Sequence, residues 1–425
     1  MKFTEKSKLL MNFFKRKKYI NNENNTKRTN NILTELYNEI FDSYEYLQSI
    51  KKNKGDKFYN SNIRKINNVS QISKPSTFNY KHFPQSIINH IDETSMNEII
   101  YKFDIFERNI KIIFVIEDIT IENNIISLYN DYVDKIIQWF YILNEYDTKQ
   151  CSKSIVIYLY MTSLEKKIPN SKINVLDETN INTAFTTTCI VDSEIVIYRK
   201  EEWFKVLIHE SFHNFNMDFS GMNTDLCNKC ILSIFPVDSN VNLYESYAEF
   251  WAEIVNALFC SFISLKNKTD LDRFLENSNY FINYERKYSF FQLSKALNYM
   301  GLKYIDLYDD TEYSESLRNT MYKEKTNVLS YFVIKTILMN NFQSFLYWCK
   351  TNNLSLMQFK KTNDNQIEFC NFIHKKYKSK SMIKNIDSTD YLLKKINKTY
   401  IQQVEPSQNI DFILTNMRMS LCELG

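Results

Sequence analysis

The spacing of apolar residues changes near residue 200, and this change limits the fold more than any other feature of the sequence. Before it, three apolar runs typical of buried strands lie among polar segments, at 112–116, 154–161 and 194–198. The stretch 121–146, between the first two runs, has helical spacing. After residue 200 only helical spacing remains. We therefore expect an α+β protein in which a small mixed β-sheet with a long helix precedes a mainly α-helical C-terminal half.

The rest of the chain divides into segments by the same criterion. Helical spacing is found in 31–52 and, after residue 200, in 200–215, 241–263, 271–283, 290–299, 315–339 and 388–398. Residues 1–28 hold nine Lys or Arg against two Glu, which is typical of a solvated tail. The sequence therefore predicts a basic disordered tail at 1–30, a helical and linker region at 31–109, a sheet-bearing half at 110–220 and a helical half at 221–425.

Glycine is too scarce for several common kinds of active site. The chain has only 4 Gly, and no two are close enough for a dinucleotide-binding GxGxxG loop, a GxxxxGK[ST] phosphate loop or a GxSxG nucleophile elbow. The formal net charge is +3, but residues 1–28 contribute +7, so the remainder carries −4. Because phosphate binding needs a continuous cationic surface, we expect no nucleic acid on the body of the protein. No apolar run approaches the roughly 18 residues of a membrane span.

The 8 cysteines are spread along the chain, which is typical of a reduced intracellular protein. Only Cys227 and Cys230 have the spacing of a metal or redox pair, and no second ligand pair stands nearby. We expect ordinary thiols there, with a metal or redox element as the alternative. Without a convincing secretory segment, an intracellular location is expected.

The strongest motif stands at the boundary between the two halves. His209, Glu210 and His213 form an HExxH sequence that uses two of the 5 histidines of the chain. Residues four apart lie on one face of a helix, so both imidazoles can reach one ion at about 2.0–2.1 Å. Glu210 projects about 100° away, beside the ion and not onto it. The alternative is two histidines and an ordinary glutamate on a helix surface.

Two histidines need a third ligand to hold a catalytic zinc. In the extended HExxHxxGxxH motif the last position would be Phe219, which cannot bind metal, and Asp218 is off by one. Farther along, Glu245, Glu249 and Glu253 stack on one helix face, and no Lys or Arg occurs between Lys229 and Lys266. Buried like charges repel, and a divalent cation would remove this penalty. An acidic helix face open to water is the alternative.

These residues resemble the gluzincin branch of zinc metallopeptidases, whose signature is HExxH followed on a later helix by ExxxD. The resemblance covers about residues 110–263. It implies a zincin-like fold with one zinc ion held by His209, His213 and Glu245, and Glu210 as the general base. Glu249 takes the place of the acid that orients the first histidine, although here it is Glu instead of Asp.

The resemblance also implies a site for an extended peptide or protein substrate. An edge strand ahead of the HExxH helix pairs with the substrate backbone in such enzymes, and the stretch with Asn182, Ala184 and Thr186 lies where that strand should be. Glu210 would take a proton from a zinc-activated water and pass it to the leaving amine. An oxyanion donor is expected from the helical half, with Tyr331 and His374 as candidates.

Two other functions are compatible with the same residues. One is a catalytically inactive zincin-fold protein that binds or has a structural role. The other is a redox or structural-metal protein centred on Cys227 and Cys230. The composition also resembles that of proteins from large DNA viruses of protists, for which the host cytoplasm or the virion would be the location.

Overall fold

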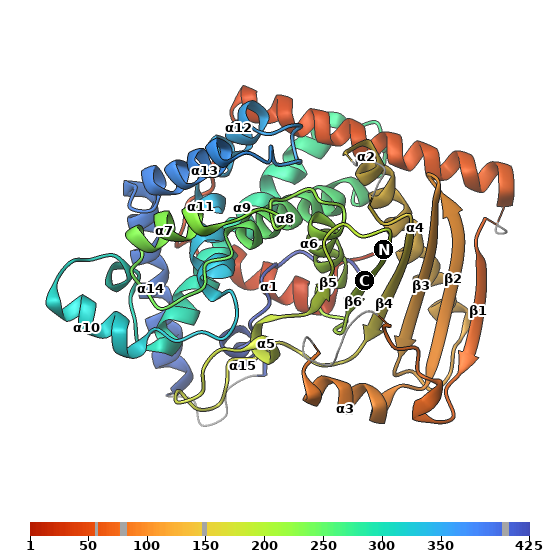
Figure 1. The fold of residues 1–425 in the computed structure, drawn as a ribbon, viewed down its shortest axis with the longest axis horizontal. Helices are drawn as coiled ribbons and strands as arrows, with labels where there is room; N and C mark the ends of the chain where they lie inside the picture. Colours follow the sequence, from red (N-terminus) through yellow and green to blue (C-terminus); the bar gives the residue numbers. More distant parts are fainter. Residues whose placement is uncertain (56–57, 77–82, 147–150, 402–407) are drawn as a thin grey trace.

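The computed structural model describes residues 1–55, 58–76, 83–146, 151–401 and 408–425. A mixed β-sheet lies on one side of the molecule and a helical body on the other (Figure 1). Helix α6 (Trp203–Asn214), which carries the HExxH motif, lies between them. The expected α+β class, with strands first and helices after residue 200, is confirmed.

The sheet has six strands in the order β1-β2-β3-β4-β6-β5. Strands β3, β4 and β6 are parallel neighbours, whereas β1, β2 and β5 pair antiparallel. The three predicted strands correspond to β3, β4 and β6, and the sequence missed β1 and β2. The bounds are β1 (Asn60–Lys65), β2 (Asn97–Ile105), β3 (Arg108–Ile116), β4 (Ser154–Met161), β5 (Ala184–Thr186) and β6 (Asp192–Ile197).

Alternation along β3 explains how both faces of the sheet are covered. Ile112 and Phe114 face helix α4 (Asn123–Tyr146), where the Phe114 and Tyr129 ring centroids are 4.7 Å apart. Ile113 and Val115 point to the other face and share a smaller core with α3 (Gln85–Thr94). The boundary predicted at residue 110 falls inside β3, because β2 and β3 form one hairpin. The polar sequence of β1, all exposed, explains why this part was interpreted as a linker.

The N-terminal segment differs from the predicted disordered tail. Helix α1 (Glu5–Arg16) is capped by the Thr4 side chain, which accepts a hydrogen bond from the Ser7 N–H at 3.3 Å. Leu10 and Phe14 are buried, and the Phe14 ring lies 5.2 Å from that of Phe291 on α9 (Leu271–Met300). The basic residues therefore occupy the outer face of a docked helix. The apolar residues of one face outweigh the charge that suggested disorder.

The helical half contains the predicted helices with shifted ends. The segments predicted at 271–283 and 290–299 form one helix, α9, which ends at Gly301 in a left-handed conformation (φ 80°). The segment predicted at 315–339 is divided into α10, the π-helical segment η5 and α11. The bounds are α2 (Lys27–Lys54), α5 (Glu178–Ile181), α7 (Asp225–Ile234), α8 (Leu243–Ile263), α9 (Leu271–Met300), α10 (Glu312–Met321), η5 (Leu329–Ile334), α11 (Lys335–Asn340), α12 (Phe342–Asn352), α13 (Asn363–Lys376), α14 (Lys380–Ile401) and α15 (Gln408–Thr415); short 3-10 turns are η2 (Val69–Gln71) and η4 (Tyr304–Leu307).

The two ends of the chain lie side by side, and the N–H of Gly425 donates to the carbonyl oxygen of Lys2 at 2.9 Å. Leu424 pairs with Phe3 in an antiparallel bridge, and one apolar core extends from Leu10 to Leu424.

Cys151 and Cys189 form a disulfide, which differs from the expectation of free thiols throughout. Within the described residues, no helix is both long enough and apolar enough to cross a bilayer.

Candidate metal centre

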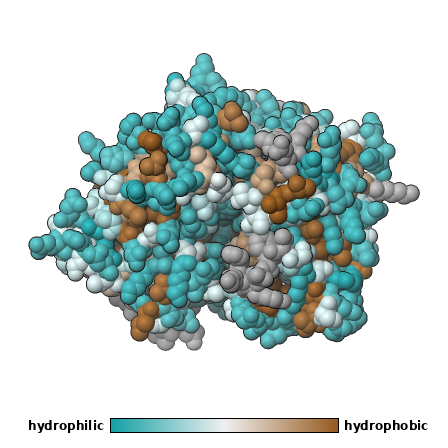
Figure 2. Space-filling model, in the orientation of Figure 1, coloured by the Kyte–Doolittle hydropathy of each residue, from teal (hydrophilic) through white to brown (hydrophobic). Residues whose placement is uncertain are grey.

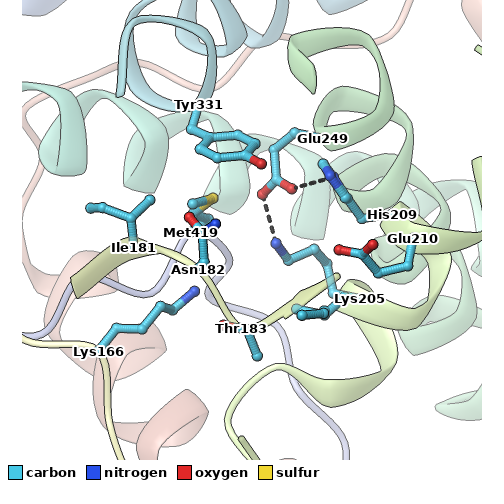
Figure 3. A pocket seen from close by; sticks show the side chains of 12 residues that line it. Lys166, Ile181, Asn182, Thr183, Lys205, His209, Glu210, Glu249, Tyr331 and Met419 are labelled. Atoms are coloured by element: carbon cyan, nitrogen blue, oxygen red, sulfur yellow. Dashed lines mark hydrogen bonds and ion pairs between the residues drawn. The ribbon is translucent and has the colours of Figure 1, made fainter. Parts of the chain in front are cut away.

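Two packed helices bring the predicted ligands together. Every residue of α6 is buried between the sheet and the helical body, and α8 packs directly against it. Because His209 and His213 are one turn apart, both rings face the first turns of α8, where Glu245 lies. Figure 2 shows a hollow between the two parts of the molecule. His209 and Glu210 line a pocket, which Figure 3 shows from close by.

The three predicted ligands converge on one point. The Nε2 atoms of His209 and His213 are 3.2 Å apart. Glu245 Oε2 is 3.0 Å from the first and 3.4 Å from the second. One ligand atom from each of the three residues therefore lies within 4.8 Å of the others.

The other nitrogen of each imidazole faces a carboxylate. Glu249 Oε2 lies 3.0 Å from His209 Nδ1, and Asp218 Oδ2 is a close partner of His213 Nδ1. Asp218 is fully buried and is held in turn by Ser220, whose N–H and hydroxyl donate to Oδ1 at 3.0 and 2.7 Å. The contact with Asp218 is a hydrogen bond, which fixes the proton of His213 on Nδ1 and leaves its Nε2 lone pair free. Glu249 faces His209 Nδ1 at an ion-pair distance and favours a proton there in the same way.

This donor set fits a divalent cation. With both Nδ1 atoms protonated, two imidazole lone pairs and a carboxylate oxygen point at the same small region, and these groups repel one another unless a positive charge lies between them. Nitrogen donors with one carboxylate suit zinc better than calcium or magnesium, which prefer oxygen. The residues present therefore fit the ion that the resemblance implies.

The pKa values of the residues at the centre also indicate that a positive charge is favoured there. Burial lowers the pKa of an imidazole, but the hydrogen bond to Glu245 and the adjacent Glu249 carboxylate outweigh it and raise the pKa of His209 to about 9. Burial is likewise outweighed at His213, whose pKa is raised well above its usual value by Asp218 and Glu245. The imidazoles in return lower the pKa of Glu245, although burial raises it. In a metal-free centre, protons would occupy the place of the cation.

Glu210 lies where a general base would be needed. It follows His209 on α6 and is 7% exposed, and Figure 3 shows its carboxylate directed toward the pocket. Burial raises its pKa, while the positive charges of His209 and His213 lower it in part. A raised pKa suits a group that takes up and releases a proton near neutral pH.

The two candidate oxyanion donors are placed very differently. The Tyr331 hydroxyl, on η5, donates to Glu245 Oε2 at 2.8 Å, and its ring lies 5.8 Å from that of His209. His374 is exposed on α13, where its ring lies 5.9 Å from that of Tyr377. Tyr331 lines the same pocket as Glu210, whereas His374 is not among its lining residues.

The three predicted substrate-binding residues lie on or beside β5. Ala184 begins this strand and lines the pocket, and the strand pairs antiparallel with β6 at the end of the sheet. Asn182 lines the pocket too, and its side-chain oxygen accepts from Thr326 at 2.8 Å. The Thr186 hydroxyl accepts a hydrogen bond from Asn214, the last residue of α6, at 3.0 Å. Strand β5 is therefore tied to the helix that carries the motif.

The three stacked glutamates of α8 have partners that differ from the expectation. From the sequence, either a divalent cation would relieve their repulsion or the acidic face would be open to water. Buried lysines from other parts of the chain instead pair with two of the three: Lys205 with Glu249 at 2.7 Å, and Lys335 with Glu253 at 2.6 Å. Glu245 alone is left for the centre. Spacing along the sequence could not reveal these partners.

The cysteine pair forms a separate cluster. Cys227 and Cys230 lie on α7, and the Cys227 thiol donates to Gln366 Oε1 of α13 at 3.5 Å. The thiol of Cys370, also on α13, lowers the pKa of Cys230 to about 7. Ligand atoms of the three cysteines do not meet the spacing that the histidine centre meets, as far as the described residues go.

Two residues that matter at the centre were missed in the sequence. Asp218 was examined only as a metal ligand, yet an acid five residues after the second histidine can return to its Nδ1. Lys205 is one turn ahead of His209 on the same face of α6, which was a usable signal.

No protein-family model, curated protein or solved structure matches this chain.

Proposed function

We propose that the protein is a zinc-dependent metallopeptidase of the gluzincin type, with a zincin-like fold, that hydrolyses peptide bonds. One observation carries the proposal. The Nε2 atoms of His209 and His213 and the Oε2 atom of Glu245 meet within 3.4 Å, while a carboxylate lies at each Nδ1. Ligand orientation of this kind supports a metal centre and is not needed by histidines that only fill a core.

Zinc would be held by His209, His213 and Glu245. When bound, it supplies Lewis acidity, which polarises a carbonyl group and lowers the pKa of water toward about 7. Three protein ligands leave a position open for water and substrate, as catalytic zinc sites require. Glu210 lies next to this centre without being one of its ligands, and it would take the proton from water and return it to the leaving amine.

The surroundings of the centre support a peptide as substrate. Among the described residues, strand β5 has a sheet partner, β6, on one side only, so its other edge can pair with an extended backbone. The pocket beside Glu210 includes Ala184 of this strand. Tyr331 would donate a hydrogen bond to the oxyanion, since its hydroxyl is within reach of the ligand Glu245.

Metal analysis combined with peptide cleavage tests this function. The wild type, Glu210→Gln and a control, Glu178→Gln, should be purified and incubated with a peptide library whose products are identified by mass spectrometry. Glu178 is an exposed acid in α5, ahead of β5. We expect one zinc per chain in all three proteins and cleavage by the wild type and the control only, because Glu210 handles the proton but does not hold the metal.

The other outcomes are equally informative. Zinc in all three proteins with no cleavage by any would contradict the peptidase activity and favour a zincin-fold binding protein. Wild-type protein that takes up no zinc would contradict the whole proposal.

A further inference from the structure

A buried lysine stands behind the candidate metal centre. Lys205 is 3% exposed and lies one helical turn before His209 on α6. Its Nζ is 2.7 Å from Glu249 Oε1, while the other oxygen of Glu249 is 3.0 Å from His209 Nδ1 (Figure 3). Lys205 and His209 belong to the same helix, α6, and Glu249 contacts both of them from α8.

We propose that Lys205 is a positioning residue of the metal centre, which acts through Glu249 to hold His209 in the orientation that binds the cation. The inference rests on the proposed function, because it assigns a residue to the same centre. It differs from that proposal in naming a group that lines the same pocket and pairs with Glu249, and not with any of the three proposed metal ligands.

The length of Glu249 explains why such a residue is needed. Where the resemblance implies Asp at this position, the chain has Glu, which has one more rotatable bond. A longer carboxylate has more orientations, and a poorly fixed one is a weaker acceptor for an imidazole N–H. Lys205 removes this freedom, because it binds one oxygen and so directs the other toward Nδ1. The lysine thus compensates for the substitution of Glu for Asp.

Charge leads to the same conclusion. Glu249 is 1% exposed and lies one turn from both Glu245 and Glu253 on α8. A buried carboxylate without a close cation is strongly disfavoured. Lys335 contacts Glu253 and not Glu249 within the ion-pair distance. Lys205 is therefore the lysine that stabilises the Glu249 carboxylate by direct contact.

The chain contains a matched control for this role. Lys335 and Glu253 form a second buried pair one turn farther along α8, with a nitrogen–oxygen distance of 2.6 Å and both residues 0% exposed. The two pairs are alike in burial and length, but Glu253 makes no contact with either histidine. Loss of Lys335 removes a buried charge and leaves the direct contact between Lys205 and Glu249 in place.

The experiment measures zinc dissociation constants by competition with a chromophoric chelator, together with urea unfolding of the zinc-free proteins. The variants are Lys205→Met, Lys335→Met, Glu249→Gln and the double variant Lys205→Met/Glu249→Gln. We expect Lys205→Met to weaken zinc binding about 10-fold or more, as for other residues that support a ligand. Lys335→Met should destabilise the fold to a similar extent and leave zinc affinity within about twofold of wild type.

The double variant tests whether Lys205 acts through Glu249. In the Glu249→Gln background the lysine has no carboxylate to position, so Lys205→Met should change zinc affinity by less than about twofold. If Lys205→Met alone does not fold, zinc affinity is compared between Lys205→Arg and the wild type, and between the double variant and Glu249→Gln. The double variant removes both charges of the pair. We expect Lys205→Arg to retain the affinity of the wild type.

Three results would overturn the inference: unchanged or tighter zinc binding by Lys205→Met, equal losses for the two lysine variants, or additive effects of Lys205→Met and Glu249→Gln. These results are distinct from failure of the proposed function. Zinc binding by the wild type without peptide cleavage would contradict the peptidase activity alone, and the affinity comparison would still decide the role of Lys205.

Discussion

Asp218→Asn is the most informative single substitution outside the three proposed ligands. The carboxylate has one oxygen on His213 Nδ1 and the other on Ser220, whose N–H and hydroxyl both donate to it. An amide has a single oxygen and cannot serve both sides. If it faces His213, its NH₂ group opposes the Ser220 N–H, and one buried hydrogen bond worth about 1–3 kcal/mol is lost. If it faces Ser220, its NH₂ group drives the His213 proton to Nε2, where metal must bind.

Both arrangements weaken metal binding. The loss of such a supporting group typically reduces affinity 10- to 100-fold, or about 1.4–2.7 kcal/mol. We therefore expect a zinc dissociation constant at least about 10-fold higher for Asp218→Asn, measured by chelator competition. Asp225→Asn is the control, because Asp225 is an exposed acid on the same segment at the start of α7. Wild-type affinity in Asp218→Asn would refute the assignment of Asp218 to the centre.

Three further predictions concern the rest of the fold. Burial raises the pKa of Glu39 from 4.5 to about 7, so the folded state holds this proton more tightly than the unfolded chain does. The free energy of unfolding should therefore fall by up to about 3 kcal/mol as pH rises from 4.5 to 7. Urea unfolding of Glu39→Gln should lack this pH dependence. Phe14→Ala should cost about 3–5 kcal/mol in the same assay, because α1 is docked by this ring, whereas a disordered tail would show no change. Cys230, with its pKa lowered to about 7 by Cys370, should be the free thiol that iodoacetamide alkylates first near neutral pH, as peptide mapping would show; equal labelling of buried Cys260 would contradict this.

The features that sequence could predict are local ones. The spacing of His209 and His213 places both imidazoles on one helix face whatever surrounds it, and the strands β3, β4 and β6 are continuous apolar runs because both of their faces are covered. Glu245 was recognisable as a candidate because it begins a helix with acids at regular spacing. Its position beside the histidines depends on the packing of α6 against α8.

The features that sequence missed depend on partners far along the chain. Lys335 lies 82 residues after Glu253 and neutralises it, so the acidic face of α8 contained less unpaired charge than its own sequence suggested. Strand β1 is polar because its side chains are exposed, and it is held in the sheet by backbone pairing with β2. Helix α1 is basic on the outside and apolar only where it meets α9. Composition alone therefore gave the wrong prediction for both segments.

X-ray absorption at the zinc edge reports which atoms surround the metal, so it distinguishes the histidine centre from the cysteine cluster. We expect two imidazole nitrogens at about 2.0–2.1 Å and carboxylate oxygen at about 2.0–2.2 Å, with the nitrogen signal reduced in His213→Ala. Sulfur at about 2.3 Å, lost on Cys227→Ser or Cys230→Ser and indifferent to His213, would contradict this expectation and place the metal at the cysteine cluster.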